Sequence, residues 1–177
     1  MIRLFASDLD GTLLNMNHQS DQTILRGLQK LQEAGCIAAT ATGRSKKLIP
    51  YRQLPGMYHV CMNGAVVLNP QMEIIASSPI DPDIIADLYH SCRDLPVEYH
   101  TLNNMLVTVG KEKMHLPDSS DPFFEAHSDF FDSIVFDAGL EQLLKEPVYK
   151  INVHHPKGAR VTQLDKWILK NQDKVTD

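Results

Sequence analysis

The sequence predicts an α/β fold whose first part is a parallel sheet with helices on its faces. Over residues 2–68, short apolar runs alternate with a segment of helical spacing and with turn signals, which is typical of successive β–α–β units. Hydrophobic residues make up 43% of the chain and charged residues 22%, the balance of a globular protein. The 177 residues are enough for one domain plus part of a second.

The first predicted strand is Ile2–Ser7, a mostly apolar run that ends at acidic residues and Gly11. Because the run is mostly apolar, as strands of a parallel sheet are, we expect it to be buried on both faces. A helix is predicted over Asp21–Ala34, and Gly35 fits its left-handed C-terminal stop. Four apolar residues of that segment have helical spacing: Ile24, Leu25, Leu28 and Leu31.

A second strand is predicted over Cys36–Ala41, followed by a short helix over Ser45–Gln53. Two more strands, His59–Met62 and Ala65–Leu68, are separated by Asn63-Gly64, a strong turn signal. The order strand, helix, strand, helix, strand implies right-handed crossovers and a parallel sheet.

The composition pattern changes near Pro79, and a domain boundary is expected between Ser77 and Asp81. This boundary divides the chain into residues 1–79 and 80–177, and the second part is predicted to be an α+β unit. Its expected elements are a helix, two hairpin strands, a polar loop, two more strands and a final helix: Asp81–Arg93, Val97–Thr101, Met105–Val109, Leu116–Pro122, Ser133–Phe136, Val148–His154 and Gly158–Lys170.

Charge and cysteine content narrow the functional classes. The net charge of -5 argues against a general nucleic-acid binder. An acidic protein that handles phosphates needs local cations, and a bound metal ion is the expected source. The three cysteines match no metal-finger spacing and are odd in number, so we expect reduced thiols in a cytosolic protein: Cys36, Cys61 and Cys92. No stretch approaches the roughly 20 apolar residues of a membrane span.

Two carboxylates, Asp8 and Asp10, follow the first predicted strand. In open α/β sheets ligands bind at the carboxyl ends of the strands, and a bend at Gly11 would turn both acids toward that edge. One carboxylate can attack phosphorus and form an aspartyl-phosphate, while the other protonates the leaving oxygen and later activates water. Mg²⁺ bridging protein and phosphate oxygens would screen the repulsion between two anions.

Simpler interpretations stay open for several of these residues. Asp-x-Asp-Gly also occurs in solvated turns and calcium loops, although an EF-hand starting at Asp8 fails because Leu13 and Gln19 stand where glycine and glutamate are needed. Thr42 could cap a following helix. Asn63-Gly64 could serve as a turn alone.

Three segments together resemble the haloacid dehalogenase (HAD) superfamily, in the form of its Cof-type phosphatases. Asp8-Leu9-Asp10-Gly11-Thr12-Leu13-Leu14 resembles motif I, Thr40-Ala41-Thr42-Gly43-Arg44 resembles motif II in its Thr-Gly-Arg form, and Met62-Asn63-Gly64-Ala65 resembles the Asn-Gly-Ala segment that follows. The resemblance covers residues 1 to about 75 well and the later part more loosely. It implies a Rossmann-like core, incomplete at its C-terminal end, with an inserted α+β cap of the C2 type.

The resemblance also implies roles for individual residues. Asp8 would be the nucleophile and a Mg²⁺ ligand, and Asp10 would be the general acid/base and bind Mg²⁺ through its main-chain carbonyl. Thr42 would donate a hydrogen bond to the transferring phosphoryl group, with help from the Gly43 amide. Two more residues would lie near the mouth of the site and contact substrate: Arg44 and Asn63.

The implied function is Mg²⁺-dependent hydrolysis of a small phosphorylated metabolite, such as a sugar phosphate. The family pattern also needs a later lysine motif and a Gly-Asp-x-x-Asn-Asp-like motif, and neither occurs before Asp177. We therefore expect the front portion of such an enzyme, with an open sheet edge where returning strands are missing. A non-catalytic fragment that binds or simply folds is an alternative, as is a phosphotransferase or mutase.

Overall fold

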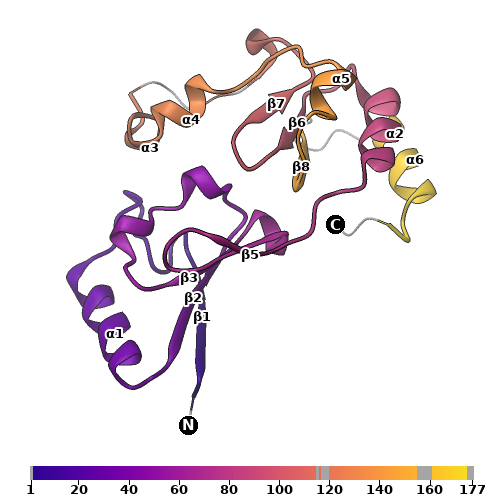
Figure 1. Cartoon of the computed structure of the whole chain (residues 1–177). Coiled ribbons are helices and arrows are strands. Elements are labelled where there is room, and N and C mark those ends of the chain that lie inside the picture. The colour runs from indigo at the N-terminus through magenta and orange to yellow at the C-terminus, as the bar shows by residue number, and fades with distance from the viewer. Residues whose placement is uncertain (1, 115, 117–119, 155–160, 175–177) are drawn as a thin grey trace. The chain divides into compact units, whose positions relative to one another are not determined.

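The computed structural model consists of two compact units (Figure 1). Residues 2–114, 116, 120–154 and 161–174 are described. The first unit comprises Met1–Pro79 together with Pro117–Asp132, and the second comprises Ile80–Leu116 together with Ser133–Asp177. A segment from the later half of the sequence is therefore part of the first unit.

A five-stranded sheet forms the centre of the first unit, in the order β1-β2-β3-β4-β5. Its strands are β1 (Leu4–Asp8), β2 (Ile37–Ala41), β3 (Tyr58–Cys61), β4 (Val66–Leu68) and β5 (Ile74–Ser77). The pairs β1–β2 and β2–β3 are parallel, which confirms the predicted α/β core, and β4 and β5 add an antiparallel side. No sequence pattern predicted β5.

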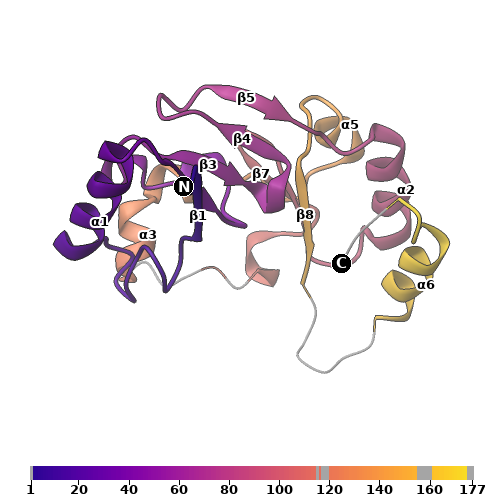
Figure 2. The ribbon, with the colours of Figure 1, turned by 90° about the horizontal axis from the view of Figure 1, so that it is seen from below.

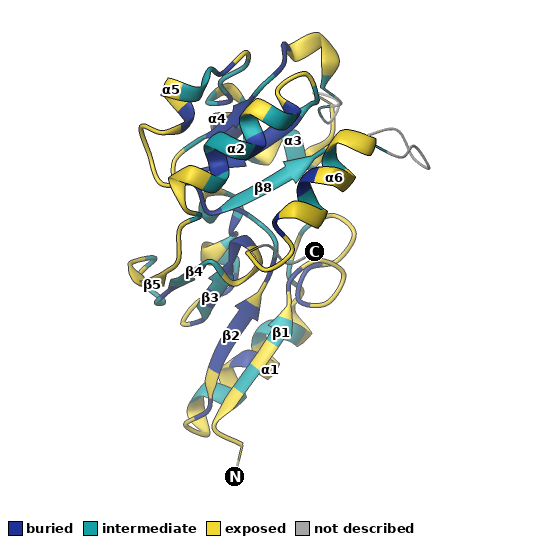
Figure 3. Ribbon diagram, turned by 90° about the vertical axis from the view of Figure 1, so that its right-hand side faces the viewer, coloured by how far each residue is buried: buried dark blue, intermediate teal, exposed yellow. Residues whose placement is uncertain are grey.

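The strand β1 lies at an edge of this sheet, so the prediction that it is buried on both faces is wrong. Among the described strands it pairs with β2 alone, with Asp8 opposite Ala41. Leu4 is 58% exposed, and Ala6 is exposed as well. The neighbouring β2, in contrast, has three consecutive buried residues (Figure 3). An apolar run in the sequence does not distinguish an edge strand from a central one. The open sheet edge that the sequence predicted is present on the free side of β1.

The helix α1 (Gln22–Glu33) covers one face of the sheet (Figure 1) and has the expected ends. The Asp21 carboxylate accepts hydrogen bonds from the main-chain N–H groups of Thr23 and Ile24, at 2.7 and 2.9 Å. Gly35 has φ +73°, the left-handed conformation of a helix stop. The inner side of α1 contributes Leu28 to the core of the unit.

The predicted helix over Ser45–Gln53 is wrong. Two short 3₁₀ turns replace it, η1 (Lys46–Leu48) and η2 (Tyr51–Gln53). Pro50 separates them because proline has no N–H to donate and disfavours helical geometry in the residue before it. Ile49 is accordingly extended, with φ −82° and ψ 119°.

The second unit is built on a three-stranded antiparallel sheet, in the order β7-β6-β8. Its main elements are β6 (Val97–His100), β7 (Met105–Val107), β8 (Lys150–Val153), α2 (Pro82–Cys92), α5 (Leu140–Leu143) and α6 (Thr162–Lys170). Helices α2 and α6 lie side by side near β8 (Figure 2). One face of the sheet, with Val97 and Tyr99, packs in a core that includes Leu88 and Trp167. The predicted hairpin, first helix and strand β8 are confirmed.

Two predictions for the later chain need correction. Ser133–Phe136 is not a strand, because Val135 alone forms a bridge, to Leu106. Two short helices that no pattern predicted stand before it: α3 (Pro122–Ala126) and α4 (Ser128–Asp132). Residues 117–119 of the predicted polar loop and 158–160 of the predicted last helix lie outside the described residues.

A polar group centred on Glu98 lies on the sheet of the second unit. The Glu98 side chain is 11% exposed, and its carboxylate accepts a hydrogen bond from Asn152 Nδ2 at 2.8 Å. His154 Nε2 lies 2.8 Å from Glu98 Oε1, and His100 Nε2 lies 3.1 Å from Oε2. Burial acts to raise the pKa of Glu98, but the hydrogen bonds from His100 and Asn152 and the nearby histidine charges outweigh it and lower this pKa to about 2.

Asp87 has a similar structural role between α2 and α6. Its carboxylate accepts hydrogen bonds from the Trp167 indole N–H at 2.9 Å and from Lys170 Nζ at 3.0 Å. The three cysteines are free and buried, in agreement with the expected thiols. Within the described ranges, no helix has the length and apolar character needed to cross a membrane.

Candidate active site

The loop that follows β1 is fixed to the core, while the acids on either side of its first residue remain outside. Three of its leucines are buried: Leu9, Leu13 and Leu14. The last two donate main-chain hydrogen bonds to the carbonyl of Leu9, at 3.1 and 2.9 Å. Gly11, with φ +72°, permits the tight reversal between them. Asp8 and Asp10 flank the buried Leu9, and both are exposed.

Asp8 and Thr42 stand at neighbouring strand ends. Asp8 is opposite Ala41 in the parallel register, and the Thr42 N–H donates to the Val60 carbonyl at 2.9 Å, which extends β2 by one residue. Thr42 is buried, and its Oγ1 accepts a hydrogen bond from the Arg44 main chain at 3.2 Å. The described residues offer the Asp8 carboxylate no hydrogen bond and no ion pair.

Asp10 is held by Arg44 through a bidentate contact. Arg44 Nε donates to Asp10 Oδ2 at 2.9 Å, and Nη2 donates to Oδ1 at 2.5 Å. Partial burial acts to raise the pKa of Asp10, but the hydrogen bonds and the charge of Arg44 outweigh it and keep this pKa below its usual value. In this arrangement Asp10 is therefore ionised at neutral pH, the form that accepts a proton.

Asn63 lies in the 3₁₀ turn η3 (Met62–Gly64), directly after β3. It is exposed and has φ +57°, a conformation that asparagine tolerates better than most residues. Main-chain hydrogen bonds connect this turn to motif II: Asn63 N–H to the Thr42 carbonyl at 3.3 Å, and Met62 N–H to the Arg44 carbonyl at 3.0 Å. The ends of β1, β2 and β3 thus bring together all the predicted site residues: Asp8, Asp10, Thr42, Gly43, Arg44 and Asn63.

Two residues that sequence analysis did not identify also belong to this cluster. His18 Nδ1 lies 2.9 Å from Arg44 Nη2 and 3.3 Å from Asp10 Oδ1. The Phe123 ring of α3 lies 4.8 Å from the His18 ring and 5.0 Å from Arg44 Cζ. His18 follows the acidic motif at no diagnostic spacing, and Phe123 is distant in sequence, so no local signal could have found them.

The sequence model of the haloacid dehalogenase-like hydrolases matches residues 5–176, nearly the whole chain. The chain therefore belongs to this family of hydrolases. The mixed α/β sheet and the position of the acids after β1 agree with that membership.

The chain covers only part of the length of each individual relative. The HMP-PP phosphatase of Enterobacter sp. (strain 638) is 29% identical over 117 residues, which are 63% of this chain and 42% of that protein. The chain thus matches less than half of that relative. A haloacid dehalogenase-like hydrolase from B. subtilis has a TM-score of 0.71 at 20% identity, with 97% of this chain and 67% of that chain covered. A sugar phosphatase of HAD subclass IIB has a TM-score of 0.65 at 18% identity, with 94% and 62% covered. At these identities the two structural likenesses show the fold.

Proposed function

We propose that this chain acts as a magnesium-dependent phosphatase that hydrolyses small phosphomonoesters through an aspartyl-phosphate on Asp8. The observation that carries the proposal is the state of Asp8, which is an exposed carboxylate at the carboxyl end of β1 with no partner among the described residues. A carboxylate without hydrogen bonds keeps its lone pairs available for attack on phosphorus.

The two acids divide the reaction between them. An Asp8 oxygen attacks phosphorus, the ester P–O bond breaks, and the leaving oxygen takes a proton from Asp10. Water then attacks the aspartyl-phosphate, Asp10 takes the proton of that water, and phosphate leaves with Asp8 restored. Since Asp10 is ionised in its contact with Arg44, it has to gain a proton before it serves as the acid.

Neutral and cationic donors beside Asp8 fit the needs of phosphoryl transfer. Thr42 has a hydroxyl group at the adjoining strand end, and its own proton remains for a phosphoryl oxygen while Oγ1 accepts from Arg44. The Gly43 amide is proposed to assist it. Arg44 and Asn63 are proposed to contact the substrate at the mouth of the site.

The oxygen donors of the acidic loop suit magnesium. Mg²⁺ is usually held by one or two carboxylates together with water and substrate phosphate, and within the described ranges no group of three His, Cys, Asp or Glu side chains could hold a metal alone. The exposed Asp8 carboxylate and the Asp10 main-chain carbonyl are the proposed ligands. When bound there, Mg²⁺ would screen the repulsion between Asp8 and the phosphate.

Sugar phosphates are the proposed substrate class, in line with the sugar phosphatase among the similar structures. The test is hydrolysis of p-nitrophenyl phosphate by the purified chain, with and without Mg²⁺. We expect hydrolysis that needs Mg²⁺ and that Asp8→Asn reduces by at least about 10³-fold, because the nucleophile is lost.

Asp94→Asn is the matched control, since Asp94 is another exposed aspartate and lies in the second unit. It should retain full activity. Unchanged activity in Asp8→Asn would refute the nucleophile assignment. A wild-type chain that folds and hydrolyses nothing would favour the non-catalytic alternative, and transfer of phosphate to an acceptor other than water would favour the transferase.

A further inference from the structure

His18 is held in an uncommon backbone conformation by its own loop. Its φ of +57° lies in the left-handed region, which is uncommon for residues other than glycine. Asn15 closes the loop: its Oδ1 accepts from the main-chain N–H groups of Asn17 and Gln19 at 2.9 and 3.1 Å, and its carbonyl accepts from the His18 N–H at 2.9 Å. Strained backbone of this kind persists where the surroundings over-determine it, and it is common at functional sites.

The contact between His18 and Arg44 determines which ring nitrogen carries the proton. A guanidinium group has only donors, so the Nδ1 that lies 2.9 Å from Arg44 Nη2 has to supply a lone pair. Nδ1 is then the acceptor, and Nε2 carries the ring proton. In this tautomer Nδ1 donates nothing to Asp10, although Oδ1 is 3.3 Å away. The ring therefore acts on Asp10 through Arg44.

The Arg44 guanidinium is restrained on several sides. Four of its five N–H groups have acceptors: two meet the Asp10 carboxylate, one meets His18, and one meets the Leu48 carbonyl at 2.9 Å. The Phe123 ring lies against both the guanidinium and the His18 ring. Removal of the His18 acceptor would leave an Nη2 hydrogen unpaired in a side chain that is 8% exposed.

We infer that His18 is a positioning residue, whose Nδ1 fixes the Arg44 guanidinium across the Asp10 carboxylate. This inference rests on the proposed function, in which Asp10 transfers protons. A fixed Arg44 keeps the Asp10 carboxylate in one orientation during each turnover. Proton transfer depends on such geometry, so His18 contributes to the rate of the chemical step more than to substrate affinity.

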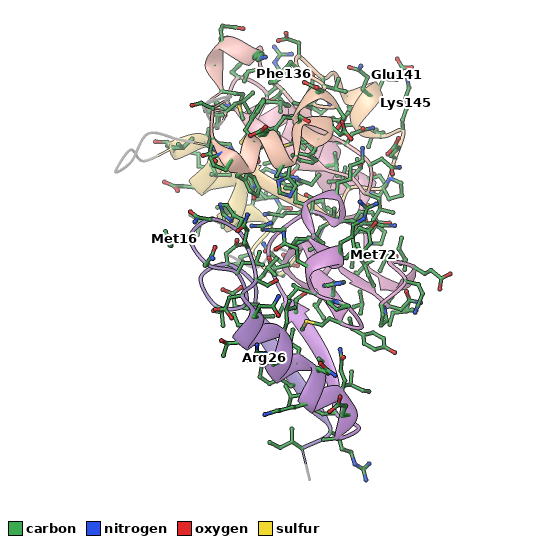
Figure 4. All side chains as sticks on the ribbon, turned by 90° about the vertical axis from the view of Figure 1, so that its left-hand side faces the viewer. Met16, Arg26, Met72, Phe136, Glu141 and Lys145 are labelled. Carbon is green, nitrogen blue, oxygen red and sulfur yellow. The ribbon has the colours of Figure 1, made fainter. Side chains whose placement is uncertain are left out.

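The test compares two substitutions that both tolerate positive φ. His18→Asn keeps an acceptor near the position of Nδ1, while His18→Gly removes it, and both residues adopt left-handed backbone readily. Met16→Ala is the control in the same loop, because Met16 is 89% exposed and its side chain projects away from the ribbon (Figure 4). The comparison between Asn and Gly thus isolates the acceptor from the backbone.

Two measurements are made on the full chain. In ¹⁵N NMR, wild type should show the Nε2–H tautomer of His18 and a slowly exchanging Arg44 Nε–H. Exchange of that Arg44 proton should accelerate at least about tenfold in His18→Gly and stay near wild type in His18→Asn. In Mg²⁺-dependent hydrolysis, His18→Gly should lower kcat about tenfold with KM changed less than about twofold, and His18→Asn should recover most of the loss.

Particular results would overturn the inference. An Nδ1–H tautomer, or an Arg44 proton that exchanges equally in the Asn and Gly variants, contradicts it whether or not the chain turns over substrate. Equal kcat in wild type and His18→Gly contradicts it when Asp8→Asn is inactive, and the proposed function then survives. If Asp8→Asn is fully active, the proposed function fails first, and the NMR result decides the contact alone.

Discussion

In the second unit Glu98 and Asp87 each accept hydrogen bonds from more than one side chain, whereas in the first unit Asp8 accepts none from the described residues. Glu98 is also nearly buried, while Asp8 is exposed. The same chemical group is therefore used for stability in one unit and left available in the other.

This difference shows how a carboxylate with a structural role differs from one that is available to a ligand. A buried carboxylate has lost its hydration, and only well-placed donors compensate for that loss. Glu98 has such donors, and its use as a nucleophile would break them. Asp8 is exposed and its carboxylate has no partner among the described residues, so a phosphate or a cation could bind there without breaking a contact that those residues make. Asp10 is intermediate, since Arg44 holds it but it stays exposed.

The largest expected effect is that of Glu98→Ala on the second unit. We expect the free energy of unfolding to fall by about 3–5 kcal/mol, because the substitution leaves the buried donor of His100 and the half-buried donor of Asn152 without the Glu98 acceptor. Trp167, the single tryptophan, lies in the core of this unit, and its fluorescence reports the unfolding.

Asp8→Asn is the matched substitution in the first unit. It removes a carboxylate that has no described partner, so the free energy of unfolding should change by less than about 0.5 kcal/mol while activity is lost. A large destabilisation by Asp8→Asn, or none by Glu98→Ala, would remove the contrast between the two acids.

The second expected effect separates the units by pH. His59 is 1% exposed, lies 2.9 Å from Thr40 Oγ1 through Nδ1, and burial lowers its pKa from 6.5 to about 4. The unfolded chain therefore binds this proton at a higher pH than the folded chain does. The first unit should have the full His59 contribution above pH 6.5 and lose about 3 kcal/mol as the pH falls to 4.

The stabilising contribution of Glu98 changes at lower pH than that of His59. The pKa of Glu98 is depressed from 4.5 to about 2, so its contribution is complete above pH 4.5 and is lost as the pH falls toward 2. Between pH 6 and 5, amide NMR signals of β2 and β3 should lose protection from exchange while Trp167 fluorescence stays constant. If amide protection and Trp167 fluorescence were lost together between pH 6 and 5, the assignment to His59 would be wrong. It would also be wrong if His59→Phe still lost amide protection of β2 and β3 in that range.

The smallest expected effect concerns Tyr99, in the core of the second unit. Its side chain is 0% exposed, and its hydroxyl has no partner among the described residues. Since a buried hydroxyl without a hydrogen bond is costly, Tyr99→Phe should stabilise the unit by up to about 1 kcal/mol, measured by denaturant unfolding with Trp167 fluorescence. Tyr58→Phe, at a half-buried position in the first unit, should change little. A destabilised Tyr99→Phe variant would mean that the hydroxyl has a partner.

The sequence predicted the elements whose signals are local. Asp21 and Gly35 mark the ends of α1, and Pro82 begins α2, because caps and proline act on their immediate neighbours. The prediction was wrong for elements whose burial depends on residues far away in the sequence. Ile2–Ser7 reads as a central strand, although exposure of Leu4 depends on which strands pair with it. Pro50 is a local signal against a continuous helix over Ser45–Gln53, because proline in a helix interior breaks the helix.

The candidate site follows the same division. Asp8, Asp10 and Thr42 are recognisable because acids and hydroxyls follow apolar strands directly. The contact of Arg44 with Asp10 depends on two strand ends being adjacent. Sequence analysis therefore predicted that both residues belong to the site but did not predict their ion pair. His18 and Phe123 enter through a loop and a helix whose positions depend on tertiary packing, which sequence spacing does not encode.

The free side of β1 has a consequence for how copies of this chain behave together. Its main-chain donors and acceptors are unpaired by any described strand, and Ile2 beside them is 75% exposed. Such an edge is a template for a strand from a second molecule, and repeated addition leads to aggregation. The rim of the sheet that carries the candidate nucleophile is therefore also open to intermolecular strand addition.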